Sequence, residues 1–191
     1  MPRYGVFFIA FILFGSGLYL LWLTLSPAYI PIPKQWDVPA PHEAKQLTEN
    51  RLYIPKLKLN VPYGETADAL NNGAWHRYPD RGNPEKGGNF ILAGHRFEMG
   101  WTYQEVNKKS PFYHIDQLHI GDDIFVDFSG KRYEYQISDQ LKVKPTQVEI
   151  EASSIDPKLT LYTCTLGGEM DGRDVIIARP VASNVDPSLV F

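Results

Sequence analysis

The sequence predicts an all-β domain, built as a sandwich or a closed barrel, behind one N-terminal helix long enough to cross a membrane. Two observations predict the domain: from residue 51 on, short runs rich in Val, Ile, Tyr and Phe alternate with turn residues, and helical periodicity is scarce. A stretch without charge over residues 4–25 predicts the helix. The 191 residues suffice for one domain of ordinary size plus this extra segment.

The composition excludes two classes of protein. Hydrophobic residues make up 43% and charged residues 21%, which is typical of a globular chain rather than a disordered one. The net charge is −3, and no basic stripe with interleaved aromatic residues is present, so the sequence gives no support for nucleic-acid binding. The single cysteine, Cys164, excludes a disulfide bond within the chain.

The apolar stretch over residues 4–25 has the length of a membrane span. At about 1.5 Å per residue it forms roughly 33 Å of helix, against a hydrocarbon core of about 30 Å. Tyr4, Tyr19 and Trp22 lie near its ends, where amphipathic rings favour the membrane interface. A cleaved signal peptide is the alternative, but its apolar region is usually only about 7 to 15 residues long. We therefore expect a retained anchor over residues 1–25.

The residues that flank this span predict its orientation and a spacer. Arg3 precedes the span, whereas the first positive charge after it is Lys34, so the positive-inside tendency favours a cytoplasmic N-terminus and an extracellular domain. Residues 26–50 begin with a proline-rich stretch, and proline favours extended backbone, so we expect a semi-rigid spacer there. Trp36 within it either docks on the domain or is an exposed linker residue.

The globular part, expected over residues 51–183 and followed by a tail over residues 184–191, reads as a series of strands. In order, the expected strands are residues 51–55, 57–63, 88–95, 122–128, 131–138, 141–150, 159–164 and 174–181. Ser129 and Gly130 separate two of them and predict a hairpin. Helical patterning is confined to residues 66–71 and 103–109.

The one cysteine stands at the end of a predicted strand. Because successive side chains of a strand alternate between its faces, Thr160, Tyr162 and Cys164 share one face. Cys164 is followed by the polar, glycine-rich residues 165–172, a setting that suits an exposed nucleophile better than a core thiol. A lone cysteine is nevertheless more often a small buried apolar residue, so its neighbours must decide.

Two further residues stand at strand ends. If the strands on either side of residues 165–172 pair antiparallel, Arg173 lies beside Cys164, whereas Arg179 is about 20 Å away. A reactive thiol also needs a proton acceptor. His95 ends an apolar strand, as Cys164 does, and follows Gly94, which permits an unusual turn. The other histidines are His42 in the spacer and His76, His114 and His119 in stretches typical of surface positions.

These segments resemble the signature segments of sortases: NFILAGHR, LTLYTC and RDVIIA match an apolar strand that ends in Gly-His, a strand that ends in Thr-Cys, and a strand that opens with Arg. RLYIPKLKLNVPYGE, GNPEKGGN and PFYHIDQLHIGDDIFV match further family segments in the same order. The resemblance covers residues 51–181. Leu166 replaces a proline of many members, and the loop LGGEMDG matches no subgroup, so no subgroup is assigned.

The resemblance implies an eight-stranded β-barrel and a cysteine transpeptidase with Cys164 as nucleophile, His95 as proton-transfer partner and Arg173 as oxyanion stabiliser. Such an enzyme cuts an L-P-x-T-G-like sorting signal of a surface protein or pilin between Thr and Gly. It then transfers the acyl group to a primary amine, from a peptidoglycan precursor or a pilin lysine. No cofactor and no metal is expected.

Strand alternation also predicts where the peptide binds. Thr160 and Tyr162 share the face of Cys164, and Ala93 shares that of His95, so these three residues are expected to floor the groove for the sorting peptide. The alternative is that this face packs into the core. Glu149, Glu151 and Asp156 lie near one another but have the spacing of an ordinary solvated strand and turn, not of a metal site.

Three other classes of protein fit the sequence less well. A papain-like protease needs its histidine after the cysteine, whereas His95 precedes Cys164. An L,D-transpeptidase needs a Ser/His-x-Gly-Cys segment, which is missing. A barrel that binds without activity is disfavoured because all three catalytic residue types are present.

Overall fold

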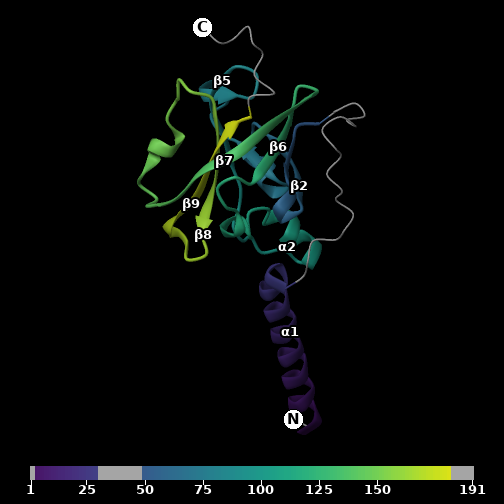
Figure 1. Ribbon diagram of the computed structural model, residues 1–191. Helices are drawn as coiled ribbons and strands as arrows, with labels where there is room; N and C mark the ends of the chain where they lie inside the picture. Colours follow the sequence, from purple (N-terminus) through teal and green to yellow (C-terminus); the bar gives the residue numbers. More distant parts are fainter. Residues whose placement is uncertain (1–2, 30–48, 182–191) are drawn as a thin grey trace.

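The computed structural model describes residues 3–29 and 49–181, and it places a β-barrel at one end of a long helix (Figure 1). Eight strands follow one another around the barrel in the order β3-β2-β1-β6-β7-β9-β8-β5, and pairing of β3 with β5 closes the ring. The β2–β3 and β5–β8 pairs are parallel and the other pairs in the ring antiparallel. The predicted closed eight-stranded barrel is confirmed.

The elements have the following bounds. The strands are β1 Arg51–Ile54, β2 Leu59–Gly64, β3 Ala74–His76, β4 Gly82–Asn83, β5 Gly87–Ala93, β6 Asp123–Phe128, β7 Lys131–Val143, β8 Lys158–Thr165 and β9 Gly168–Pro180. The helices are α1 Arg3–Tyr29 and α2 Tyr103–Lys109, with 3-10 turns η1 Pro55–Leu57, η2 Ala67–Asn71, η3 Pro79–Arg81, η4 Ile115–Gln117 and η5 Val148–Glu151. Strand β4 pairs with the start of β5. The helix predicted over residues 103–109 is confirmed, and the stretch over 66–71 forms a 3-10 turn.

The predicted hairpin is confirmed between β6 and β7. Ser129 and Gly130 both have positive φ, 49° and 79°, as a two-residue hairpin turn requires. The prediction of separate strands over 131–138 and 141–150 was wrong, because β7 runs without a break to Val143. A register shift between Ile137 and Asp139 adds a residue there, which changes the phase of the alternation and makes one strand read as two.

Alternation sends one face of each strand into the barrel. The interior includes buried apolar residues from all eight strands of the ring: Leu52, Ile54, Tyr63, Ala74, Phe90, Leu92, Ile124, Val126, Ile137, Leu159, Leu161 and Ile176. The opposite face of β5, β8 and β9 carries a smaller apolar cluster of Ile91, Ala93, Tyr162 and Val175. Residues 144–157, which connect β7 to β8, contribute Ile150 to that cluster. The outer face next to the predicted nucleophile is therefore packed rather than bare.

Helix α1 is long and apolar enough over Phe7–Ala28 to cross a membrane, which is consistent with a membrane anchor or a signal sequence. Most of its large apolar side chains are exposed, including Phe8 and Phe11. The helix continues past the predicted end of the anchor at residue 25, and Leu23 and Ser26 are buried against the domain. Most of the expected spacer, with Trp36 and His42, and the expected tail over 184–191 lie outside the described residues.

Candidate active site

The parallel pair β5–β8 brings the ends of two strands together. Its register pairs Ala93 with Tyr162, and the Gly94 N–H donates to the Tyr162 carbonyl at 3.1 Å, so the ladder continues past the end of β5. His95 and Cys164 each lie two residues beyond this last pair. Because adjacent strands are about 4.8 Å apart, the predicted base and the predicted nucleophile stand at the same edge of the sheet.

Gly94 is required by a close approach and not by an unusual backbone turn. A Cβ at this position would lie 2.6 Å from the Phe112 ring. Gly94 is absent from the described glycines with positive φ, so the expected turn conformation was wrong. The Phe112 N–H donates to the His95 carbonyl at 3.2 Å. The missing side chain thus lets Phe112 approach and hold the backbone that carries the histidine.

The antiparallel pair β8–β9 brings the third predicted residue to the same place. Cys164 and Arg173 are direct register partners, which confirms the predicted pairing of the two strands. The next pair is Thr165 with Gly168, so residues 169–172 of β9 have no partner on β8 and form a bulge between these two pairs. Arg179 lies at the other end of the pair, where its Nη1 donates to the Pro157 carbonyl at 3.4 Å.

The bulge over residues 169–172 holds the Arg173 side chain. The Nη1 of Arg173 donates to the Glu169 carbonyl at 2.8 Å and to the Gly172 carbonyl at 2.9 Å. The Thr165 hydroxyl donates to the Asp171 carboxylate and ties the bulge to β8. A guanidinium has five N–H groups, so an arginine anchored through Nη1 retains donors that can reach a substrate oxygen.

The surroundings of the thiol favour its neutral form. Burial raises the pKa of Cys164 above its usual value, the Arg173 guanidinium lowers it, and the Glu169 carboxylate raises it again. The net effect is a raised pKa of Cys164, because desolvation of the half-buried sulfur outweighs the attraction of the Arg173 guanidinium. The thiolate, which is the nucleophilic form, must therefore be favoured by further interactions during reaction.

This balance predicts how fast Cys164 reacts with iodoacetamide as pH changes. Since a negative Glu169 raises the pKa of the thiol, Glu169→Gln is expected to shift the rate profile to lower pH. Since Arg173 lowers that pKa, Arg173→Gln is expected to shift the profile to higher pH. The rate of alkylation at each pH is measured by quenching the reaction at set times and detecting the modified protein by mass spectrometry. Shifts in the same direction for both variants would contradict these assignments.

A buried arginine next to His95 connects the two sides of the site. The Arg96 side chain is 5% exposed, and its Nη1 donates to the Asp174 carboxylate at 3.0 Å. Its Nη2 donates to Asp116 at 2.7 Å. Arg96 directly follows His95, and Asp174 directly follows Arg173, so this ion pair fixes the two strand ends relative to each other. Sequence reasoning missed it, although Arg96 belongs to the segment NFILAGHR.

The predicted substrate-binding residues lie on the outer face but support the connection over residues 144–157. Thr160 is fully buried and donates to the Asn89 Oδ1 at 2.6 Å. The Asn89 amide donates in turn to the carbonyls of Ile150 and Ala152, at 3.0 and 2.7 Å. Ala93 and Tyr162 are each 7% exposed. In the described structure these residues contact the connection over residues 144–157, which covers them.

Tyr162 holds the same connection through an ion pair. Its hydroxyl donates to the Glu151 carboxylate at 2.5 Å and accepts from the Arg77 Nη1 at 2.8 Å. Arg77 and Glu151 are 3.0 Å apart. Burial and Glu151 raise the pKa of Tyr162, so the hydroxyl stays a donor. The expectation that Glu151 is solvated was wrong, because its carboxylate compensates a cation 74 positions away in the chain.

His76 was also expected at the surface, and this was wrong. It is 1% exposed, packs edge-on against Phe90 with ring centroids 4.7 Å apart, and its Nε2 bonds to the Gly82 carbonyl at 3.1 Å. Burial lowers the pKa of His76, which keeps the ring neutral. The histidine is therefore a core residue at the end of β3, where it pairs with Leu92 of β5, and it is not one of the strand-end residues of the candidate site.

The packing of Ala93 predicts the effect of a larger side chain. Ala93→Leu adds three carbons to a cluster that already contains Tyr162, so the free energy of unfolding should fall by about 1–3 kcal/mol. The KM for peptide should rise, because displaced Tyr162 would loosen the connection over residues 144–157. Denaturant unfolding and steady-state kinetics measure the two effects. Ala152→Leu, at an exposed alanine of that connection, is the matched control, and unchanged values for Ala93→Leu would contradict the described packing.

Comparisons with known proteins identify the family and the fold. Residues 52–181 match the family model of the sortase domain. Sortase SrtE1 of Streptomyces coelicolor is 33% identical over 135 residues, which cover 60% of this chain and 35% of the relative. The chain thus spans about a third of the length of that curated relative.

Solved sortase structures share the fold. Listeria monocytogenes sortase A is 23% identical with a TM-score of 0.58, over 69% of this chain and 86% of that one. Sortase A from Corynebacterium diphtheriae is 21% identical with a TM-score of 0.59, over 76% of this chain and 65% of that one. With a barrel of this topology, and with the family model matching most of the chain, the protein belongs to the sortase family of cysteine transpeptidases.

Proposed function

We propose that the chain is a membrane-anchored transpeptidase that attaches surface proteins or pilins to a primary amine. Residues 1–25 anchor it with the N-terminus in the cytoplasm, residues 26–50 are an extracellular spacer, residues 51–183 form the catalytic domain, and residues 184–191 are a tail. The family membership and the apolar α1 support this arrangement.

In the first half of the proposed reaction, the Cys164 thiolate attacks the Thr carbonyl of an L-P-x-T-G-like sorting signal. The carbonyl oxygen becomes an oxyanion, which the Arg173 guanidinium stabilises as a charged donor. His95, as imidazolium, protonates the Gly nitrogen when the C–N bond breaks. The products are a thioester on Cys164 and the released C-terminal fragment of the signal.

In the second half, a primary amine of a peptidoglycan precursor or a pilin lysine attacks the thioester. His95 accepts the proton that the amine loses and becomes imidazolium again, and the C–S bond breaks to regenerate the thiolate. A thioester retains enough acyl reactivity to form a new amide without a cofactor. Thr160, Tyr162 and Ala93 shape the peptide groove by holding the connection over residues 144–157 in place.

The observation that carries the proposal is the direct pairing of Cys164 with Arg173 beside the parallel strand that leads to His95. The test is a panel of sorting-motif peptides, each incubated with several amine acceptors and read by mass spectrometry. An amide between the N-terminal fragment and an acceptor is the expected product. A protein whose Cys164 is alkylated by iodoacetamide but which converts no peptide with any acceptor would instead be a binding module.

A further inference from the structure

The C-terminal half of α1 is attached to the catalytic domain by specific contacts. The Tyr19 hydroxyl donates to the Trp101 carbonyl at 2.7 Å, and the rings of Trp22 and Tyr103 lie 6.0 Å apart. Leu23 is 2% exposed. The partners of Tyr19 and Trp22 lie in residues 97–110, the loop and helix α2 that follow His95. Helix α1 therefore sits directly against the segment that leaves the active site.

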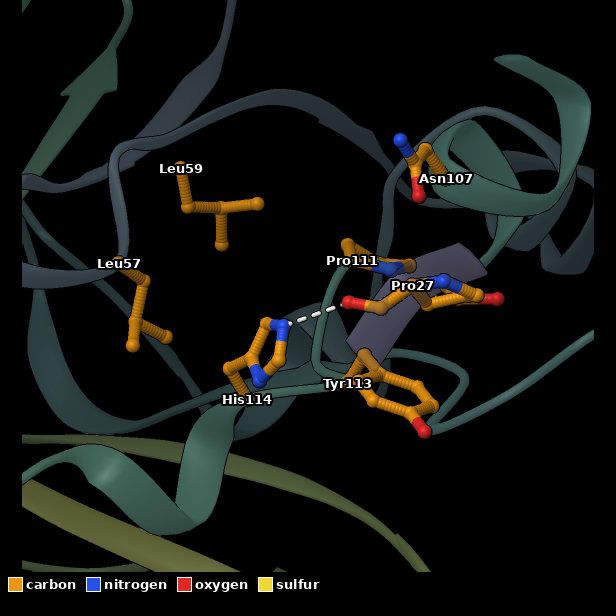
Figure 2. Close-up of a pocket in the computed structure, with 8 residues that line it drawn as sticks. Pro27, Leu57, Leu59, Asn107, Pro111, Tyr113 and His114 are labelled. Atoms are coloured by element: carbon orange, nitrogen blue, oxygen red, sulfur yellow. Dashed lines mark hydrogen bonds between the residues drawn. The ribbon is translucent and has the colours of Figure 1, made fainter. Parts of the chain in front are cut away.

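The end of α1 is capped by the domain. The last four carbonyls of a helix lack partners within the helix. One of them, the Pro27 carbonyl, accepts from the His114 Nε2 at 2.8 Å (Figure 2). The His114 Nδ1 accepts from the Gln117 amide at 3.0 Å. Pro27 lines a small pocket together with Leu57, Leu59, Asn107, Ser110, Pro111, Tyr113 and His114. This hydrogen bond and the packing around Pro27 hold the C-terminal end of α1 against the domain. They therefore fix the position of the domain along the helix axis.

That height can be compared with the thickness of a bilayer. About 20 residues at 1.5 Å each are needed to cross a hydrocarbon core of about 30 Å. Counted from Tyr4, the first residue after Arg3, the twentieth residue is Leu23. Tyr19 then lies about 6 Å inside the outer boundary, and a helix tilted by about 20° would bring it deeper. The loop bonded to the Tyr19 hydroxyl must accordingly reach the membrane interface.

The surface of this loop suits that position. The Trp101 side chain is 85% exposed and Met99 is 41% exposed, and residues 99–104 carry no charge. A tryptophan has an apolar body with one polar N–H, which is why this residue is enriched at the boundary between lipid and water. An indole so exposed has little packing within the domain, whereas lipid headgroups and acyl chains would cover it.

We infer that the uncharged tip of this loop, residues 99–102, inserts Trp101 and Met99 into the interface of the bilayer, and so seats the barrel directly on the membrane. The inference rests on the proposed role of α1 as a retained anchor. The loop begins two residues after His95, and the β8–β9 hairpin lies at the same end of the barrel as α2 (Figure 1). The membrane therefore lies close beneath the active-site end of the barrel, where it limits substrates to those presented at the bilayer surface.

The test uses fluorescent probes at single positions of the full-length chain. Cys164 is the only cysteine, so Cys164→Ala gives a background without thiols. Trp101→Cys, Phe11→Cys and Ile155→Cys are each labelled with an environment-sensitive NBD fluorophore. The proteins are reconstituted in phosphatidylcholine–phosphatidylglycerol vesicles, with or without a lipid that carries a nitroxide near the top of its acyl chain. Phe11 probes the anchor, and Ile155, 100% exposed in the β7–β8 connection, is the matched water-facing control.

The expected result is blue-shifted emission and loss of most of the fluorescence to the nitroxide lipid at position 101, with no quenching at position 155. Quenching at position 11 together with a fully water-exposed probe at position 101 would overturn the inference and leave the anchor standing. A water-exposed probe at position 11 would contradict the anchor itself, and with it the seating of the barrel. The exposed side chains at all three positions make a loss of folding an implausible cause of either outcome.

Discussion

Replacing Cys164 by alanine is expected to abolish both peptide cleavage and acyl transfer. The proposed reaction forms a covalent bond to this sulfur, and the chain contains no other thiol that could replace it. The expected loss is the largest of any single substitution in the chain. It is measured as product formed from a sorting-motif peptide in the presence of an amine, by mass spectrometry.

The control for this variant is its fold and its peptide affinity. Cys164 is half-buried at the end of β8, so removal of one sulfur atom should leave the barrel and the groove unchanged. Circular dichroism and peptide binding should therefore stay close to those of the unmodified protein. A purified variant with more than a few per cent of the original turnover would rule out Cys164 as the nucleophile.

Arg173→Ala is expected to cost a factor of about 10²–10³ in kcat, the usual loss for one oxyanion donor. Because the oxyanion exists only in the transition state, the KM should change much less than kcat. His95→Ala should also lower kcat heavily, since the leaving amine would lose its proton donor. Steady-state kinetics with one peptide and one saturating amine measures all of these variants.

Arg179→Ala is the matched control for Arg173→Ala. Both arginines lie on β9 and on the same face of the strand, but only Arg173 pairs with Cys164. Arg179 contacts the Pro157 carbonyl at the opposite end, so its removal should change kcat little. If Arg179→Ala were the more damaging change in a folded protein, the oxyanion would have to form elsewhere than beside Cys164.

The parts of the fold that depend on local alternation could be predicted from the sequence. The β6–β7 hairpin follows from two strand-like runs around Ser129 and Gly130, and α2 from the pattern of residues 103–109. The neighbourhood of Cys164 and Arg173 follows from the same rule, because two strands joined by a short segment pair antiparallel. The closure of the ring could be predicted only from the family resemblance, because β3 and β5 meet through only two register pairs.

The polar contacts that support the site could not be predicted in this way. Arg96 and Asp174 are 78 positions apart, and Arg77 and Tyr162 are 85 apart. Neither pair leaves a periodic signal, because each partner alone looks like a solvated charge or a strand aromatic. Glu151 and His76 were misjudged for the same reason. A polar residue becomes buried only where a distant partner satisfies it, and a single sequence does not show that partner.

Trapping the acyl-enzyme tests the central claim most directly. The protein is mixed with a cleavable sorting-motif peptide without an amine acceptor, quenched in acid, digested and analysed by mass spectrometry. The account predicts the N-terminal peptide fragment joined through its Thr carbonyl to Cys164, released by hydroxylamine as the hydroxamate and absent from Cys164→Ala. Peptide turnover without a hydroxylamine-sensitive adduct, or with the adduct on another residue, would contradict it.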